Sequence, residues 1–348
     1  MEEEVGLELA MEEDTSKWFP RSNSAREVRD RLVAFALDKG VDLQYNQRIT
    51  RLQRESSSGM WYCESEGGEQ YRAPRVVVAM GGKSFPAVGT DGKGYQLAQE
   101  LGHTIRPVYP ALTPLTGPHP GGNQLAGVSL NVGVTAEAGP SGQLRTDAHR
   151  TGFLFTHRGY SGPSILDLSH HAVIDIEGLR EAADGTRTTA ITVNWCDMSE
   201  ESWRGLFLSA LAKGGSATRL VSNMLGERMP HRLALALCEE AGVAHQRMAD
   251  LTKDKREQLI GLLTQYRLPY TGHQGYKKAE VTGGGVSLEE VKWETLESGI
   301  EANRGLFFCG EVLDCFGRIG GFNFYWAWVT GRLAGMSAAS ARLSSPSS

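Results

Sequence analysis

A run of three valines, Val76 to Val78, constrains the fold most, because it has the pattern of a strand buried on both faces. A second short apolar run, Leu306 to Cys309, lies far along the chain. Strands buried on both faces are typical of parallel sheets that carry helices on either side. The sequence therefore predicts an α/β protein that contains a parallel sheet.

Helices and further strands are predicted on both sides of the valine run. Apolar residues recur at near-helical spacing from Ala25 to Ala36, and Gly94 to Leu101 has a similar pattern. Short strands are predicted over Val41 to Leu52 and Gly59 to Cys63. An alanine-rich helix is predicted from Phe322 to about Arg342, after the Leu306 run, so the α/β pattern occurs near both ends of the chain.

The middle of the chain has a different character. Five prolines follow Arg106, and alternating apolar residues from Leu130 to Val134 and from Ile191 to Trp195 predict antiparallel strands. Between Ser199 and Gln265 the pattern is helical. There Pro230 suits a first helical turn, and Asp254 with Glu257 resembles a capping box.

These changes of pattern suggest that two insertions interrupt one nucleotide-binding-type domain, in a chain of 348 residues that is long enough for more than one core. The expected division is residues 1–106 for the first part of that domain, 107–198 for a β-barrel-like insert, 199–265 for a small helical insert, 266–281 for a return through the β insert, and 282–348 for the C-terminal part of the domain.

Composition excludes several classes of protein. A formal net charge of −5 and 22% charged residues are ordinary for a globular protein and do not indicate a nucleic-acid partner. The five cysteines are widely spaced, with no pattern of metal ligands, so no metal site is predicted and a reducing compartment is favoured. There is no signal-like start and no apolar run of ~20 residues, so we expect a cytoplasmic protein without a membrane partner.

The first segment that attracts a ligand hypothesis follows the valine run and contains Ala79, Gly81 and Gly82. In open parallel sheets ligands bind beyond the carboxyl ends of the strands, where glycine allows close backbone approach. A plain tight turn explains the same glycines equally well.

The second segment is Gly310 with Glu311, directly past the second buried run. A carboxylate there could accept hydrogen bonds from a polyol such as the ribityl chain of a flavin. The alternative is a solvated loop glutamate.

The third segment, Gly320, Gly321, Phe322 and Asn323, leads straight into the predicted C-terminal helix. Unpaired N–H groups at a helix start suit a phosphate or the negative charge of a reduced flavin, whereas a simple capping turn is the competing interpretation. Most aromatic residues from Phe322 to Trp328 are expected to be packing residues, with one in contact with a ring ligand.

Four stretches together resemble one family. Val78 to Pro86, Phe155 to Pro163, Ala279 to Val286 and Gly310 to Trp328 are similar to the BaiN/YhiN-like, aminoacetone-oxidase-like FAD-binding flavoproteins. The resemblance spans nearly the whole chain, and its last block is the most specific part.

The resemblance implies an FAD-binding Rossmann-like domain interrupted by the two inserts. It implies that Ala79, Gly81 and Gly82 pass close to FAD, that Gly310 and Glu311 meet the ribityl region, and that Gly320 to Asn323 face the isoalloxazine. The implied activity is that of an FAD-dependent oxidoreductase with a small-molecule substrate and NAD(P)H as a candidate electron donor. No catalytic residue and no oligomeric state follow from it.

The chain departs from the family pattern in three places. Met80 replaces an expected threonine, and Phe322 stands where tyrosine is common. No G-x-G-x-x-G occurs, and Glu12 to Ser22 resembles a segment that follows that motif, so we expect an N-terminally truncated chain without its first βαβ unit, in which Met1 corresponds to an internal methionine. The alternatives are a non-catalytic or partial gene product that keeps the fold without binding FAD unaided, and a site for a nicotinamide cofactor alone.

Two further groups of residues are candidates for a catalytic or metal-binding role. Ser161 is not in a nucleophile-elbow pattern, because Pro163 follows Gly162, and His157 is a candidate proton donor for which a structural role is the stronger interpretation. The pair His170 and His171 lacks a third ligand and is predicted to lie on the surface.

Overall fold

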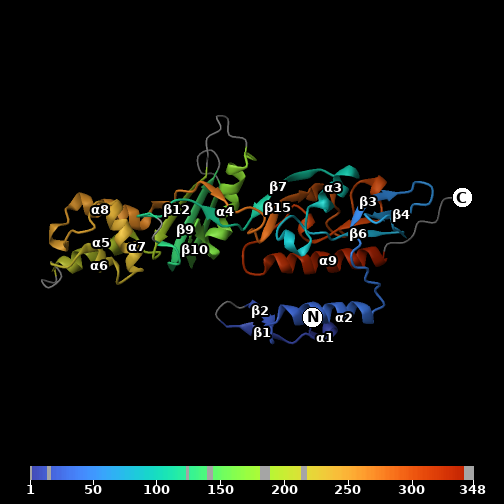
Figure 1. The fold of residues 1–348 in the computed structure, drawn as a ribbon, viewed down its shortest axis with the longest axis horizontal. Helices are drawn as coiled ribbons and strands as arrows, with labels where there is room; N and C mark the ends of the chain where they lie inside the picture. The colour runs from blue at the N-terminus through green and yellow to red at the C-terminus, as the bar shows by residue number, and fades with distance from the viewer. Residues whose placement is uncertain are drawn as a thin grey trace.

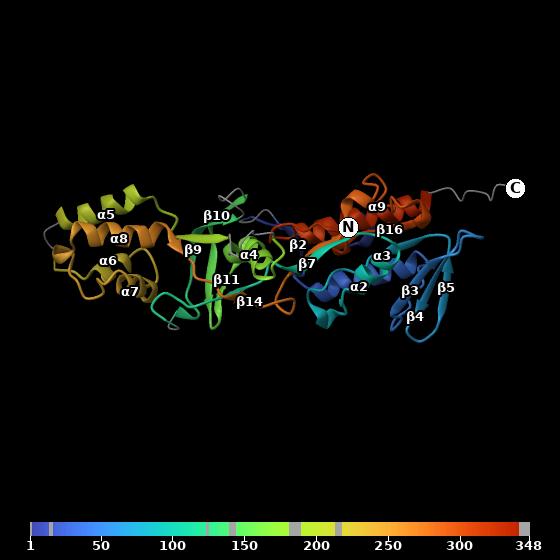
Figure 2. The same cartoon turned by 90° about the horizontal axis from the view of Figure 1, so that it is seen from above.

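The computed structural model of the chain describes residues 2–13, 17–122, 125–138, 144–180, 189–212 and 218–340. The molecule is elongated, with a helical end, a central antiparallel sheet beside helix α4, and an α/β part at the other end (Figure 1). The same order of parts is seen from above (Figure 2). The helical, antiparallel and α/β parts thus follow one another along the long axis.

The parallel sheet predicted from the valine run is present as one pair of strands. Strand β6 (Val76–Val78) pairs in parallel with β16 (Leu306–Phe308), and Val77 lies opposite Phe307. The expectation that the valine run is buried on both faces is wrong, because the Val77 residue is 39% exposed. Within the described residues β16 is the only strand paired with β6, so the other edge of β6 has no strand beside it.

Short elements surround this parallel pair. An antiparallel sheet is formed by β3 (Ile49–Arg54), β4 (Trp61–Ser65) and β5 (Gln70–Ala73), while β7 (Ile105–Ala111) pairs with β15 (Val281–Val286), and the helices are α3 (Lys93–Glu100) and α9 (Phe322–Ser340). The Trp61 indole is fully buried and donates to the Arg304 carbonyl at 3.2 Å, which ties β4 to the start of β16. Of the predicted strand from Val41, only the part from Ile49 is a strand.

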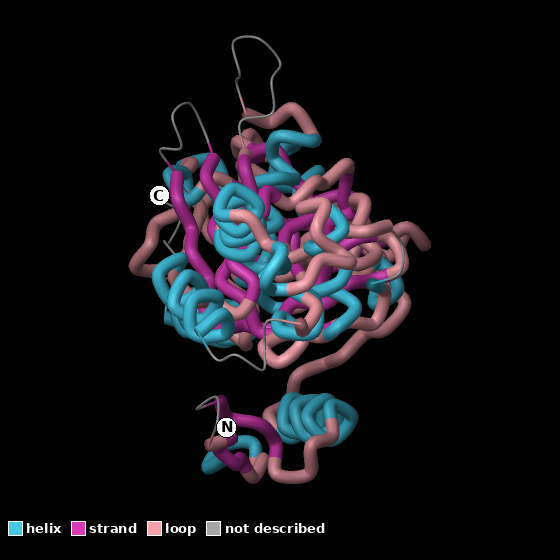
Figure 3. Tube along the Cα trace, turned by 90° about the vertical axis from the view of Figure 1, so that its left-hand side faces the viewer, coloured by secondary structure: helices cyan, strands magenta, loops and turns pink. Residues whose placement is uncertain are grey.

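A small N-terminal unit lies beside the main body. It contains α1 (Glu2–Val5), β1 (Leu9–Glu12), β2 (Lys17–Pro20) and the predicted helix α2 (Ala25–Asp38), and Figure 3 shows it apart from the rest, joined by a connecting loop. The Ser24 hydroxyl caps α2 by accepting from the Glu27 N–H at 3.3 Å. Glu4 and Arg332 of α9 form an ion pair at 3.5 Å, which links this unit to the main body.

The middle of the chain forms an antiparallel sheet, as predicted. Within the described residues its seven strands lie in the order β13 (Tyr266–Arg267), β12 (Ala190–Trp195), β9 (Ser129–Ala138), β10 (Leu144–Thr156), β11 (Gly159–Ser161), β8 (Leu115–Thr116) and β14 (Gly272–His273). Helix α4 (Pro163–Ile176) packs on this sheet and was not predicted. Its signal was present, since Ile165, Leu168 and Ala172 are buried at helical spacing behind a proline in the first turn.

The predicted helical segment contains α5 (Glu200–Ala212), α6 (Val221–Leu225), α7 (His231–Glu240) and α8 (Lys253–Thr264). Two predicted helix starts are wrong in detail. Pro230 precedes α7 as its N-cap, and Thr252, not Asp254, caps α8 by accepting from the Lys255 N–H at 3.3 Å. Threonine is a better cap here because its hydroxyl lies one residue before the first helical turn.

More than one core is present. The larger core joins the antiparallel sheet to the helices and contains a cluster of stacked aromatic rings around Trp195. A second core surrounds β16, with Trp61, Phe307 and Phe308 among its fully buried side chains. The ends of β6 and β16 border this second core.

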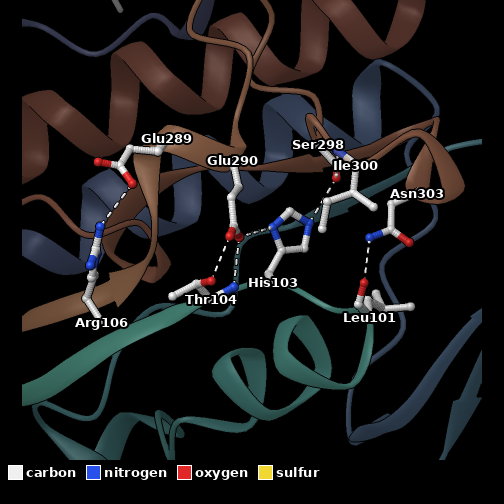
Figure 4. Close-up of polar contacts among 9 residues, drawn as sticks. All are labelled: Leu101, His103, Thr104, Arg106, Glu289, Glu290, Ser298, Ile300 and Asn303. Atoms are coloured by element: carbon white, nitrogen blue, oxygen red, sulfur yellow. Dashed lines mark hydrogen bonds and ion pairs between the residues drawn. The ribbon is translucent and has the colours of Figure 1, made fainter.

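A buried histidine network holds the start of β7 against the chain before β16 (Figure 4). The His103 side chain is 0% exposed, its Nδ1 lies 3.4 Å from Glu290 Oε2, and its Nε2 is 2.9 Å from the Ser298 hydroxyl. Glu290 also accepts from the Thr104 N–H at 2.7 Å and from the Thr104 hydroxyl at 2.6 Å. The His103 ring packs edge-on against Phe308, so the network borders the second core.

This network predicts that acid destabilises the fold. Burial lowers the pKa of His103 below its ordinary 6.5, which the Glu290 carboxylate only partly offsets. The folded chain therefore binds this proton less readily than the unfolded chain, so the stability is present above pH 6.5 and is lost as the pH falls below it. The slope for one proton is at most about 1.4 kcal/mol per pH unit.

The measurement is the free energy of unfolding in urea between neutral and mildly acidic pH. His103→Gln cannot titrate, so its pH slope is expected to be flatter than that of the wild type, although the variant is less stable at neutral pH. Equal slopes for the two proteins would assign the acid loss to other groups, such as the buried His171, whose pKa burial also lowers.

Candidate functional site

Three chain segments meet at one residue, Thr282. They are the turn after β6, the start of β15 and the turn after β16. The Thr282 hydroxyl accepts from the Lys83 N–H at 2.8 Å and the Ser84 N–H at 3.1 Å, and its own N–H donates to Glu311 Oε1 at 2.9 Å. The carboxyl end of β6 and the turn after β16 are therefore held together by β15. This is the edge at which α/β sheets bind ligands.

Glycine is required at position 82 by this convergence. A Cβ placed on Gly82 would overlap Glu311 Oε1 and the Thr282 hydroxyl, and would lie 2.7 Å from the Thr282 Cβ. At Gly81 the backbone has φ +67°, a left-handed conformation that favours glycine. The two glycines thus serve a tight turn against Thr282 and Glu311, while Ala79 is exposed directly after β6.

Glu311 has a half-buried carboxyl group at this edge. Burial raises its pKa, and hydrogen bonds from the Thr282 side chain and N–H oppose that rise. Burial also raises the pKa of Tyr95, and the Glu311 carboxylate raises it further. The carboxyl of Glu311 is a hydrogen-bond acceptor in a poorly solvated position, which suits recognition of hydroxyl groups.

The loop before α9 is closed by Asn323. Its side chain accepts from the Gly317 N–H at 2.7 Å and donates to the Gly317 carbonyl at 3.0 Å. Gly320 and Gly321 follow with φ +117° and +94°, and a Cβ on Gly321 would meet no described atom within 4 Å. The Asn323 amide is thus used within the loop, and the open space lies at Gly321.

Helix α9 holds the turn after β16 from its own second turn. Trp326 Nε1 donates to the Gly310 carbonyl at 3.1 Å, and the Thr330 hydroxyl accepts from the Gly310 N–H at 2.9 Å. The first N–H groups of an α-helix have no partner within the helix. The start of α9 therefore carries such donors on the same helix whose later turns hold Gly310.

The expectation that most aromatic residues of α9 are packing residues is wrong. Trp326 packs against the second core, but Phe322, Phe324, Tyr325 and Trp328 are all exposed, Phe324 by 74%. Within the described residues no element covers this face of α9 well enough to bury it. Helical spacing alone does not say which faces of an aromatic-rich helix have a neighbour.

The histidines predicted from sequence do not join the cluster around Thr282. His157 is exposed on the turn between β10 and β11, in the antiparallel sheet. The surface prediction is wrong for His171, which is buried, and His170 is partly buried. Both residues belong to α4, and their ring centres lie 4.0 Å apart. Burial lowers the pKa of His170 to about 3, since its ring lies against Phe316.

Two residues that organise the site were missed. Thr282 stands in one of the family-like stretches but was given no role, and Asp167 of α4 was not considered. Asp167 accepts from the Ile319 N–H at 2.6 Å and from Arg318 Nε at 3.2 Å. A hydroxyl before the glycine run at 283–285 was the available signal for Thr282, whereas nothing local marks Asp167.

A wide groove opens beside the turn after β6. Its volume is about 1560 Å³, and it is lined by residues of 46–49, 80–93 and 274–277. The lining includes four cationic side chains, of which Arg48 pairs with Asp91 and Lys83 lies 5.8 Å from the centre of the Tyr276 ring. The groove thus has a basic lining next to Gly81 and Gly82.

The described residues contain no group of three or more His, Cys, Asp or Glu side chains that could hold a metal ion. Among the same residues, no helix has both the length and the apolar character needed to cross a bilayer.

The parallel strand pair, the glycine turns at its carboxyl edge and the helix that starts beside them define an α/β protein of the Rossmann type. Residues 1–337 match the family described as the HI0933-like protein Rossmann domain. The chain belongs to this family, which confirms the resemblance inferred from the four sequence stretches.

Curated relatives extend this result. The chain is 30% identical over 292 residues to the ribosomal RNA dihydrouridine synthase of Haemophilus influenzae. The matched stretch covers 83% of this chain and 63% of the relative. It is 28% identical over 310 residues to the enzyme of the same name from Escherichia coli, covering 88% and 70%. It is 33% identical over 325 residues to the 3-dehydro-bile acid delta(4,6)-reductase of Clostridium scindens, covering 92% and 75%. The chain thus spans less than two thirds of the length of the first of these relatives.

Proposed function

We propose that the protein is an FAD-dependent oxidoreductase whose flavin lies along the edge formed by Gly81, Gly82, Glu311 and the start of α9. The observation that carries the proposal is the convergence of three chain segments on Thr282, which fixes Glu311 beside the ends of the parallel strands. Family membership and a reductase relative support the same activity.

The residues present fit the flavin part of the cofactor. Glu311 offers a poorly solvated carboxylate for the ribityl hydroxyls, and the N–H groups at the start of α9 suit the negative charge of a reduced ring. Gly321 leaves open space where a flat ring needs close backbone approach. When bound, FAD supplies the two-electron chemistry, and the chain binds it, orients it and limits its contact with water.

The proposed substrate is a small molecule with a carbon–carbon double bond conjugated to a carbonyl group. Two relatives are named for making dihydrouridine and one for reducing a 3-dehydro-bile acid. Both kinds of reaction add hydrogen across such a double bond, and NAD(P)H is the proposed electron donor. A net charge of −5 favours a small molecule over RNA as the substrate. The cationic lining of the groove favours RNA, so a uridine-containing RNA is the second substrate to be tested.

The proposal includes the domain division expected from the sequence. Residues 1–106 and 282–348 form the FAD-binding domain, and residues 107–198, 199–265 and 266–281 form the β-barrel-like insert, the helical insert and the return between them. The location of β6 and β16 on either side of the antiparallel sheet in the sequence supports this division.

The test is to purify the chain, add FAD and follow flavin absorbance and FAD affinity, then to assay NADPH oxidation with enones and with uridine oligonucleotides. Glu311→Ala is expected to weaken FAD binding by roughly 10-fold or more, because a hydrogen bond to a charged group contributes about 1.5–3 kcal/mol. The matched control is Glu289→Ala, whose carboxylate is exposed and pairs with Arg106 at the surface.

A chain that remains colourless and takes up no added FAD would contradict the proposal and support the non-catalytic alternative. Uptake of NADPH without FAD would support a nicotinamide site instead. Equal FAD affinity for Glu311→Ala and the wild type would remove Glu311 from the site.

A further inference from the structure

The loop from Gly317 to Gly321 precedes α9. It is bound by one residue of α4, the helix that packs on the antiparallel sheet. Asp167 of α4 is 8% exposed, and its two carboxylate oxygens accept from the Ile319 N–H at 2.6 Å and from Arg318 Nε at 3.2 Å. The two partners are separated from Asp167 by about 150 residues of sequence. The contact therefore joins two parts of the fold that meet only in three dimensions.

A buried carboxylate is costly unless hydrogen bonds satisfy it. Here the shorter bond goes to a backbone N–H, and the ion pair to Arg318 is of lesser value because the Arg318 side chain is 57% exposed. The charge of Asp167 is thus directed mainly at the backbone of the loop. An ordinary surface ion pair would not need to bury its acid.

Apolar contacts support the same attachment. Leu166 lies in a small core with Ala111 and Val281. Phe316, just before the loop, and Ile319 within it pack against this core. The His170 ring meets Phe316 edge-on at 5.3 Å between ring centres. The first half of the loop is therefore attached to α4 by both polar and apolar contacts.

Within the described residues, the second half of the loop makes no contact with α4 like that of Asp167 and Ile319. Gly320 and Gly321 have positive φ angles and no side chains, so their conformation depends on the residues on either side. Asn323 fixes the loop on the α9 side by binding Gly317, and Asp167 fixes it on the other side through Ile319. The two glycines lie between these two fixed points.

We propose that Asp167 is a positioning residue, which holds the Gly317–Gly321 loop so that its backbone and the start of α9 face the flavin. This inference rests on the proposed function, but its first test does not require a bound cofactor. Its consequence is that α4, an element of the antiparallel sheet, sets the geometry of a cofactor loop in the Rossmann-type part.

The first arm of the experiment measures hydrogen exchange of the chain without added FAD. Asp167→Ala is expected to raise the exchange rate of amides in residues 315–321 by about 10-fold or more, because it removes a charge-assisted hydrogen bond. Asp167→Asn keeps an oxygen acceptor for the Ile319 N–H and is expected to raise the rate by less than about 3-fold. Glu177→Gln, at the exposed end of the same helix, is the matched control and should leave the loop unchanged.

The second arm measures the flavin. In Asp167→Ala the FAD affinity is expected to fall by about 10-fold and the flavin reduction potential to become more negative, since the N–H groups at α9 no longer face the ring. Asp167→Asn is expected to restore most of both, with an unchanged melting temperature. A role in stability alone would shift the melting temperature and leave the potential as it is.

Unchanged loop exchange in Asp167→Ala would overturn the proposal, and so would faster exchange with an unaltered flavin affinity and potential. If the wild type takes up no FAD while the loop responds as expected, the proposed function fails and the attachment of the loop by Asp167 stands. If Asp167→Ala does not fold, Asp167→Ser, which shortens the side chain and removes the carboxylate, takes its place. Loop exchange should then rise by about 10-fold in Asp167→Ser and stay within about 3-fold of the wild type in Arg318→Gln, and the reverse order would overturn the proposal.

Discussion

Replacing Trp195 with alanine is expected to lower the free energy of unfolding by about 3–5 kcal/mol, the largest stability effect predicted for this chain. The Trp195 side chain is fully buried and stacks on Phe155 with ring centres 5.7 Å apart. It also meets Phe153 at 5.3 Å and Tyr266 at 5.5 Å. Alanine would leave a cavity bordered by three aromatic rings that cannot collapse into it.

Urea unfolding followed by circular dichroism measures this loss. Trp195→Phe keeps most of the ring area and removes an indole N–H that has no hydrogen-bond partner in the described chain, so it should cost much less than alanine. Trp293→Ala is the control, since that side chain is 78% exposed and its loss should change the free energy by no more than about 0.5 kcal/mol. Equal losses for Trp195→Ala and Trp293→Ala would show that the aromatic cluster does not hold the larger core together.

Gly82→Ala has the second largest expected effect, and it acts on the site. The new Cβ would overlap Glu311 and Thr282, so one of the three converging segments must move. We expect a loss of about 1–3 kcal/mol in the free energy of unfolding, because overpacking a tight contact strains the backbone. We also expect FAD affinity to fall by at least as much as in Glu311→Ala, because the carboxylate is displaced.

Gly205→Ala is the matched control for this substitution. A Cβ on Gly205 meets no described atom within 4 Å, and the residue lies inside α5, where alanine stabilises a helix by about 0.5–1 kcal/mol relative to glycine. The two glycine-to-alanine changes should therefore have opposite signs. A Gly82→Ala protein as stable as the wild type would mean that Glu311 and Thr282 yield at no cost, and the convergence on Thr282 would not be tight.

Much of the fold could be predicted from local patterns. The valine run and the Leu306 run are short apolar segments with glycines after them, and the parallel sheet expected from the valine run is formed by these two runs. Local patterns failed where a neighbour decides the outcome. Val77 is 39% exposed, and β16 is the only strand beside β6 among the described residues. Helix α4 was not predicted although Pro163 stands in its first turn.

The site was predictable only in its backbone. Glycines after buried strands pointed to the correct edge, since a residue without a Cβ marks a close approach in the sequence itself. The side chains that organise the edge could not be found that way. Thr282 binds backbone groups 199 and 198 residues away, and Asp167 reaches Ile319 across 152 residues. The glycine run after Thr282 marks its position but not its partners, and nothing local marks Asp167.

The three glycines of β15 have a consequence for how the molecule can move. A Cβ on Gly283 would enter the Tyr109 ring, one on Gly284 would meet the backbone at Pro107, and one on Gly285 would lie 2.7 Å from the Val312 carbonyl. The strand that carries Thr282 thus packs closely against the Tyr109 ring and backbone of β7 on one side and the backbone of the turn after β16 on the other. Because β15 is also where the chain leaves the antiparallel sheet, any rotation of that sheet would act directly on Thr282 and on the N–H that Glu311 binds. We therefore expect the two halves of the molecule to move together at this strand.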